Sequence, residues 1–263
     1  MDPARFFAAA RRTIFKGGLK QSQVETCEAV MTEAAAAGAG LRETAYMLAT
    51  ARWEPGEDMV PKEESLFYTS AARIRTVWPS RFPTEASAAP FVRNPRGLAN
   101  KVYNGRLGNR MGSDDGWIFR GRGLAHPTGR DNYGRAGAKL DLPLLEKPEL
   151  ALDLKIAARI LVVGMIEGWF TGVTSAEAAR TPDYQDDRRI INGTDKAAVI
   201  AAIAVQFEAA LAAGGWGSAG PAAAPPAADP ALAAAVDWLG EAPLPEALEA
   251  WRRVNDWIAR RPA

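Results

Sequence analysis

The feature that most constrains the fold is an abundance of alanine together with a scarcity of alternating β-branched residues. Alanine is the strongest helix former, whereas strands are typically rich in β-branched side chains. Glycines and prolines divide the chain into segments. A mainly α-helical protein is therefore predicted. The helical segments are expected at residues 22–37, 41–54, 70–78, 148–168 and 194–213, with another beginning near residue 131.

Local sequence patterns predict where several of these helices begin and end. Ser22 and Glu25 have the spacing of a capping box, and the Thr194 hydroxyl is placed to cap the last helix. Pro55 disfavours helical geometry at the residue before it. The second helix is therefore expected to end beside Glu54.

Charge and rare residue types exclude several classes of function. The net charge of the 263-residue chain is +1, so no overall field favours nucleic acid or an anionic membrane. The single cysteine, Cys27, excludes an internal disulfide framework and a cysteine-based zinc cluster. The single histidine, His126, excludes a histidine-rich metal site, and any Ser-His-Asp site would have to use it.

The first residues do not have the pattern of a secretory signal. Arg11 and Arg12 interrupt the N-terminal apolar run, and no segment approaches the ~18 apolar residues of a membrane-spanning helix. The protein is therefore expected to be made in the cytoplasm. It would act on a cell wall only after something else releases it.

The composition changes after Trp216, which defines three regions. Residues 1–216 form the predicted main domain, and residues 217–231, beginning GSAGPAAAPPAADP, are a Pro/Ala-rich linker that cannot bury a core. Residues 232–263 are predicted to be an amphipathic helical segment. Docking of this segment on the main domain is favoured over contact with a membrane or wall, because residues 229–263 hold six acidic residues against four arginines.

An acidic loop follows the predicted end of the second helix at Glu54. Residues 54–64 contain five carboxylates and one cation, Lys62. Glycoside hydrolysis needs two carboxyl groups, one protonated and one ionised. The negative end of a helix, the neighbouring carboxylates and Trp53 would each raise the pKa of Glu54, whereas a carboxylate in the loop would stay ionised. A solvated acidic surface is the competing interpretation, and the cluster alone favours it.

Residues 104–129 contain seven glycines and cannot form one regular helix. The stretch fits neither a phosphate-binding loop nor a dinucleotide fingerprint, because no strand-then-helix pattern surrounds it. Its glycines would let the backbone approach a bulky ligand, and Trp117 and the tyrosines would stack on sugar faces. A packed, irregular loop is the alternative, and the stretch taken alone favours it.

Several motifs occur in an order that resembles the family 19 glycoside hydrolases, the chitinases and related phage endolysins. The segment Arg120-Gly-Arg-Gly-Leu-Ala-His-Pro-Thr-Gly-Arg-Asp-Asn-Tyr133 resembles the signature of that family. The resemblance covers about residues 5–213. The other segments that carry it are Leu48–Glu54, which ends in the family's acid, Arg189–Thr194, which resembles its Ile-Asn-Gly segment, and the endolysin-like segments Glu63–Thr69 and Phe15–Val24.

The resemblance implies a role for each matched residue. Glu54 corresponds to the general acid, and Glu64 best matches the general base, with Glu63 as the close alternative. Thr128 corresponds to the hydroxyl that helps to hold the attacking water. The family inverts configuration, which requires carboxyl groups ~6.5–9.5 Å apart. No metal or organic cofactor is implied. The candidate substrate-binding residues are His126, Asn132, Asn192, Tyr68 and Trp117.

The resemblance also implies a lysozyme-like helical domain with two lobes flanking a substrate cleft. Peptidoglycan is favoured over chitin as the substrate, because the N-terminal and Glu63–Thr69 segments look like those of endolysins. A chitinase and a non-catalytic glycan-binding relative are the alternatives. Two departures from the family pattern motivate the non-catalytic alternative: Pro55 stands where Ser or Thr is common, and His126 stands where Gln usually binds the sugar. Trp53 also stands where His is common, whereas Thr128 and both carboxylates match the family.

Overall fold

The computed structural model describes residues 1–16 and 18–217, and over these residues the chain is mainly helical, as predicted. The predicted C-terminal helix, and all but the first residue of the predicted linker, lie outside the described residues. The cleft between two lobes stays a prediction. The elements are α1 (Pro3–Thr13), α2 (Gln21–Ala36), α3 (Leu41–Trp53), β1 (Lys62–Glu63), α4 (Ala71–Val77), α5 (Glu85–Ala88), η1 (Ala89–Phe91), α6 (Pro95–Tyr103), α7 (Asp115–Ile118), β2 (Arg122–Gly123), α8 (Arg130–Leu140), η2 (Pro148–Leu152), α9 (Leu154–Ile166), α10 (Ser175–Ala178), η3 (Asp186–Ile190) and α11 (Ala197–Ala213).

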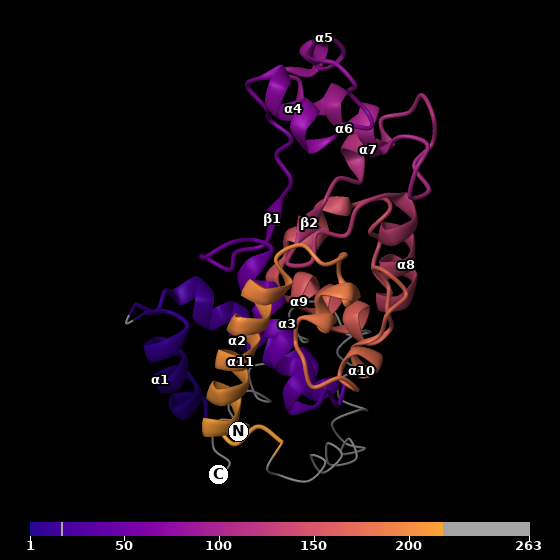
Figure 1. The fold of residues 1–263 in the computed structure, drawn as a ribbon. Coiled ribbons are helices and arrows are strands. Elements are labelled where there is room, and N and C mark those ends of the chain that lie inside the picture. Colours follow the sequence, from indigo (N-terminus) through magenta and orange to yellow (C-terminus); the bar gives the residue numbers. More distant parts are fainter. Residues whose placement is uncertain (17, 218–263) are drawn as a thin grey trace, which may run out of the picture. The chain divides into compact units, whose positions relative to one another are not determined.

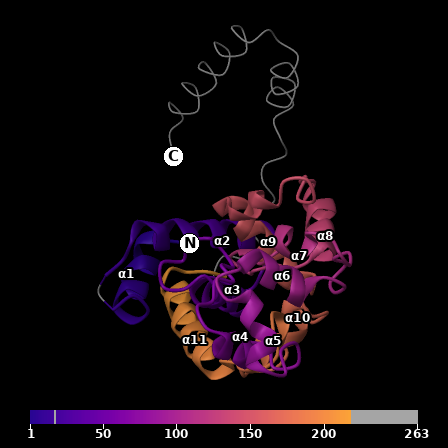
Figure 2. The ribbon, with the colours of Figure 1, turned by 90° about the horizontal axis from the view of Figure 1, so that it is seen from above.

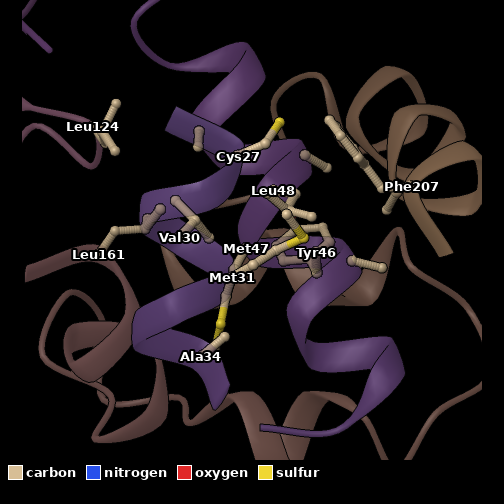
Figure 3. Packing of buried hydrophobic residues seen from close by; sticks show 14 of the residues in the cluster. Cys27, Val30, Met31, Ala34, Tyr46, Met47, Leu48, Leu124, Leu161 and Phe207 are labelled. Carbon is tan, nitrogen blue, oxygen red and sulfur yellow. The ribbon is translucent and has the colours of Figure 1, made fainter. Parts of the chain in front are cut away.

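Helix α3 is enclosed by the largest hydrophobic core, where it packs against α2, α9 and α11. Eight successive residues, Thr44–Ala51, are buried, so the helix is covered on all sides rather than along one stripe. Burial of each leucine-sized side chain stabilises the fold by ~1.5–3 kcal/mol. The core therefore anchors the C-terminal end of α3, at Glu54. Figure 3 shows part of this packing, including Val30, Met31, Tyr46, Leu48 and Phe207.

The region α4–α7 has a hydrophobic cluster of its own. Figure 1 shows these helices at one end of the described residues, joined to the others through the segments that carry β1 and β2. A third cluster joins α8, η2 and α9. Seen from above, α1 and α11 lie on one side of α3 and α8 lies on the other (Figure 2). The buried residues of the α4–α7 cluster include Leu66, Ile74, Phe82, Leu98 and Val102.

Strands β1 and β2 form a short antiparallel pair that joins two of the sequence motifs. Lys62 lies opposite Gly123, and Glu63 lies opposite Arg122. Gly123 has a φ of +85°, and a Cβ at this position would come within 2.7 Å of the Ala151 carbonyl oxygen. A glycine is therefore required here by both backbone conformation and space. The pairing places the acidic loop directly against the glycine-rich stretch.

Two predicted helix starts are wrong. Helix α2 begins at Gln21, and the Gln23 side chain accepts a hydrogen bond from the Lys20 amide at 2.8 Å. Ser22 is not the cap, because its hydroxyl donates to the Asp58 carbonyl at 2.8 Å. Thr194 does not cap α11 either, since that helix begins at Ala197, after a residue in left-handed conformation.

The helix predicted over residues 148–168 is two helices, η2 and α9. Between them Asp153 has extended backbone angles, and its carboxylate accepts hydrogen bonds from the amides of Lys155 and Ile156, each at 3.0 Å. Asp153 therefore caps the second helix and interrupts the segment. Among the described helices, none is both long and apolar enough to cross a membrane.

Candidate active site

Glu54 is the C-terminal cap of α3, as Pro55 predicts, and its amide donates to the Thr50 carbonyl at 2.9 Å. Its carboxylate forms an ion pair with Arg188 of η3, with Oε1 and Nη1 2.6 Å apart. The Arg188 side chain is 5% exposed, and its Nε also donates to the Asp195 carbonyl at 3.0 Å. A buried, doubly bound guanidinium thus fixes the carboxylate of Glu54.

A cation beside Glu54 was not predicted from the sequence, and Arg188 provides one. Cations outside the acidic loop also offset part of the negative charge of its carboxylates. Asp58 forms an ion pair with Lys20, and Glu57 forms one with Arg52 at 3.1 Å.

Glu64 follows β1 and lies in a mainly uncharged environment. Its amide donates to the Gly121 carbonyl at 2.8 Å. The Tyr103 hydroxyl, at the C-terminal end of α6, lies 2.9 and 3.0 Å from the two carboxylate oxygens and donates its proton to them. Burial raises the pKa of Glu64, although Tyr103, the Gly121 backbone and Arg120 offset part of that effect. The carboxylate therefore binds a proton more readily than an exposed glutamate does.

Glu63 has the opposite environment. Its carboxylate contacts Arg120 Nη2 at 2.7 Å and Arg122 Nε at 3.1 Å. Burial acts to raise the pKa of Glu63, but the hydrogen bonds and charges of the two arginines outweigh it and hold the pKa below its usual range. Two guanidinium groups thus occupy this carboxylate, whereas Glu64 keeps lone pairs that can accept a proton.

Gly121 lies close to Thr128 and His126, and its backbone is hydrogen-bonded to Glu64. A Cβ at position 121 would lie 3.2 Å from Thr128 Oγ1 and from His126 Nδ1, and the Gly121 carbonyl accepts from the Glu64 amide. The Thr128 hydroxyl donates to the His126 carbonyl at 3.0 Å. Its lone pairs are left to accept a hydrogen bond from another group, such as a water molecule.

His126 is held in a strained and buried position beside these groups. Its φ of +49° lies in the left-handed region, which residues other than glycine rarely adopt. Burial lowers the pKa of His126, the charge of Glu54 opposes that change, and Lys62 adds to it. Nε2 is buried and has no hydrogen-bond partner among the described residues. Such an unpaired polar atom costs ~1–3 kcal/mol unless a ligand or water satisfies it.

Two of the candidate sugar-binding residues lie close to these groups. Asn132, in the first turn of α8, donates from Nδ2 to the Thr128 carbonyl at 2.7 Å. Tyr68 packs edge-on against Trp78, and burial and the charge of Glu64 together raise the pKa of Tyr68. Both side chains therefore belong to the same neighbourhood as Glu64 and Thr128.

Trp117 and Asn192 are placed less directly. The Arg120 guanidinium lies 3.7 Å from the centre of the Trp117 ring and covers one of its faces. Asn192 is exposed, its amide donates to the Arg188 carbonyl at 3.0 Å, and its side chain accepts from the Gly193 amide. It is thus linked to Glu54 through Arg188 rather than by contact.

Within residues 1–16 and 18–217, no group of three or more His, Cys, Asp and Glu side chains is arranged to hold a metal ion. The chemistry that these residues can supply is proton donation and proton acceptance by carboxyl groups, with a hydroxyl and an imidazole in the neighbourhood. That combination is suited to hydrolysis of a glycosidic bond.

The contacts of four residues with the carboxylates were not predicted: those of Arg188, Tyr103, Arg120 and Arg122. Arg188 is 134 residues from Glu54 along the chain, so no local spacing links the two. Tyr103 immediately precedes the glycine-rich stretch and Arg122 lies within it, but their partners are 39 and 59 residues away. The pairing of β1 with β2, had it been predicted, would have pointed to Arg122.

No protein-family model matches the chain. The chain is similar to a glycosyl hydrolase family 19 domain-containing protein from Haemophilus influenzae, with 49% identity over 53 residues. The match covers 20% of this chain and 26% of the length of that relative. This partial similarity supports a relationship to the family 19 glycoside hydrolases.

Proposed function

We propose that this protein is an endolysin-like glycoside hydrolase that cleaves β-1,4 bonds of peptidoglycan with inversion of configuration. The observation that carries the proposal is that His126 and Thr128 lie in a neighbourhood that both carboxylates share. The charge of Glu54 acts on the pKa of His126, the Thr128 hydroxyl donates to the His126 carbonyl, and both side chains lie close to Gly121, whose carbonyl accepts from the Glu64 amide. Residues of two separate sequence motifs thus meet with complementary chemistry.

In the proposed reaction Glu54 is the acid and Glu64 is the base. The proton of the Glu54 carboxyl passes to the glycosidic oxygen as the bond from that oxygen to the sugar carbon breaks. A water molecule attacks the same carbon from the opposite face and gives one proton to Glu64. Its other O–H group, which stays intact, donates a hydrogen bond to the Thr128 hydroxyl. Arg188 has to yield its contact with Glu54 when that carboxyl takes up its proton.

The environment of each carboxylate also motivates the reverse assignment, because Glu54 is paired with a cation and Glu64 is buried against a phenol. A substrate with a good leaving group separates the two assignments, since it needs no acid. Under our assignment Glu54→Gln regains activity on such an aryl glycoside, and Glu64→Gln does not. Glu64→Gln instead regains activity with azide, a nucleophile that needs no base. The opposite pattern would reverse the roles.

The overall reaction is tested by digesting purified peptidoglycan with the full chain and identifying the fragments by mass spectrometry, with chitin oligomers in parallel. We expect muropeptide fragments with a new reducing end, and nuclear magnetic resonance should show the inverted anomer first. Cleavage of chitin oligomers alone would make the protein a chitinase. Binding of either glycan without cleavage would support a non-catalytic glycan-binding relative, which His126 and Pro55 motivate.

A further inference from the structure

A basic hollow of about 410 Å³ lies beside the C-terminal end of α6, outside the residues assigned to catalysis. Its wall includes three cations and two amides, and none of its lining residues is acidic. Met111 also contributes to the wall, and 79% of this side chain is exposed. The lining residues used below are Arg81, Lys101, Arg106, Asn100, Asn104 and Met111.

The three cations of this hollow lack protein partners. Within the part of the chain that the structure describes, the side chains of Arg81, Lys101 and Arg106 form no ion pair or hydrogen bond. Other arginines of the same region do form ion pairs: Arg96 contacts Asp114 at 2.7 Å, and Arg110 contacts Asp115 at 3.0 Å. The hollow therefore concentrates positive charge that the fold does not neutralise.

The amides form a fixed wall behind these cations. Asn100 donates to Asp114 Oδ1 at 2.7 Å and accepts from the Trp117 amide at 2.9 Å. Asn104 donates to the Ser113 carbonyl at 2.7 Å and accepts from the Gly116 amide at 2.9 Å. The wall is thus rigid, and a ligand would meet it without the cost of ordering these side chains.

The hollow lies next to the residue that holds the candidate base. Tyr103, whose hydroxyl donates to Glu64, stands between Lys101 and Asn104 in the sequence. A long substrate that extends from Glu64 past Tyr103 along the C-terminal end of α6 would approach the hollow. Chitin is uncharged, whereas peptidoglycan carries carboxylates on its peptide stems.

We propose that this hollow binds carboxylate groups of the peptide stems, so that the enzyme selects an acidic glycan over a neutral one. The inference rests on the proposed function, because it concerns the substrate of the same site. Arg81 and Arg106 offer forked donors that match carboxylate geometry, and Lys101 adds a mobile ammonium group. The exposed side chain of Met111 offers apolar contact to the aliphatic part of a stem.

The test compares the full chain with a variant that carries Arg81→Gln, Lys101→Gln and Arg106→Gln. The substrates are native peptidoglycan, the same peptidoglycan with its carboxyl groups converted to amides, and neutral chitin oligomers. A matched control carries Arg12→Gln, Lys147→Gln and Lys155→Gln, which remove the same charge from exposed positions elsewhere. For each pair we measure kcat/KM and the apparent Kd by co-sedimentation.

We expect the triple variant to lose about tenfold in kcat/KM on native peptidoglycan, because each exposed charge contact contributes modestly. It should lose little on amidated peptidoglycan or chitin oligomers, and the control should match the wild type. Added salt should remove the advantage of the wild type. Equal activity of variant and wild type on native peptidoglycan, or an equal loss on all substrates, would overturn the inference. If the wild type cleaves none of them, the proposed function fails, and the Kd comparison still decides whether the hollow binds carboxylates.

Discussion

The end of α3 and the β1–β2 pair each present one carboxylate, but they hold it by different means. Glu54 is fixed by an ion pair with a buried guanidinium, and it extends from a helix enclosed by the largest core. Glu64 is fixed by a backbone hydrogen bond and a neutral phenol that belongs to the α4–α7 region. One setting pairs the carboxylate with a cation, and the other raises the pKa of the carboxyl group by burial.

This difference bears on the roles that we propose for the two residues. A general acid has to carry a proton, and the carboxylate of Glu54 is engaged in an ion pair with Arg188. A general base has to be ionised, and burial raises the pKa of Glu64. Under the proposed assignment, the contact between Arg188 and Glu54 therefore has to break when the acid takes up its proton.

The largest effect should come from Glu54→Gln, which removes the proton donor and keeps the shape of the side chain. General acid assistance contributes ~10²–10⁴-fold, so kcat on peptidoglycan should fall by that order. Circular dichroism and the melting temperature serve as the control for folding. A folded variant with near-normal kcat would remove Glu54 from the mechanism.

The next test compares the two candidates for the base. Glu64→Gln should reduce kcat by ~10²-fold or more, because the attacking water loses its proton acceptor. Glu63→Gln should lose less activity and more stability, since it leaves Arg120 and Arg122 without their shared partner. Steady-state rates and denaturant midpoints of both variants decide the matter. An inactive Glu63→Gln beside an active Glu64→Gln would move the base by one residue.

Arg188→Gln probes the ion pair at α3. The Glu54 side chain is 20% exposed, so its charge would lose a partner where water only partly replaces it. We expect a loss of about 3 kcal/mol in the free energy of unfolding. Adding Glu54→Gln should recover part of that loss, and this double-mutant cycle isolates the pair. Arg189→Gln, at the exposed neighbouring position, is the matched control. Additive effects of the two substitutions would mean that the pair does not stabilise the fold.

Tyr103→Phe probes the phenol at β1. The Tyr103 hydrogen bond lowers the pKa of Glu64 against the effect of burial, so its removal should raise that pKa further. The base must be ionised to act, so the acidic limb of the pH profile of kcat/KM should move to higher pH. Tyr184→Phe, which removes a similar bond to Glu208, is the control. An unshifted limb in Tyr103→Phe would exclude Glu64 as the group that the limb reports.

The smallest effect is expected from His126→Gln, which should retain activity. Burial holds the pKa of His126 below its usual value of ~6.5, so the unfolded chain binds a proton at a higher pH than the folded chain does. The wild type should therefore lose stability as the pH falls below about 6.5, and the variant should lose less. The acidic limb of the pH profile of kcat/KM should also change in the variant, because glutamine forms no positive charge near Glu54. Identical stability profiles for the two proteins would show that burial of His126 does not control its protonation.

The sequence predicted the helical class and the end of α3 because both follow from local preferences. Pro55 alone was sufficient to place Glu54 at a helix end. Local patterns failed where two of them competed: Ser22 matched a capping box, but Gln23 and Lys20 form the reciprocal bond instead. The motif resemblance pointed to Glu64 and Thr128, and the structure places both beside Gly121. It could not identify Arg188, because that ion pair depends on how distant segments pack.

The register of the short β1–β2 pair has a consequence for the surroundings of Glu63 and Glu64. Neighbouring residues of a strand point to opposite faces, so Glu63 meets the arginines while Glu64 meets the phenol. A slip of one residue would exchange their surroundings. Gly123, which leaves no room for a side chain, secures that alignment against the Ala151 carbonyl. The spacing of the backbone thus decides which glutamate meets the arginines and which meets the phenol, and one residue inserted into β1 would exchange their surroundings.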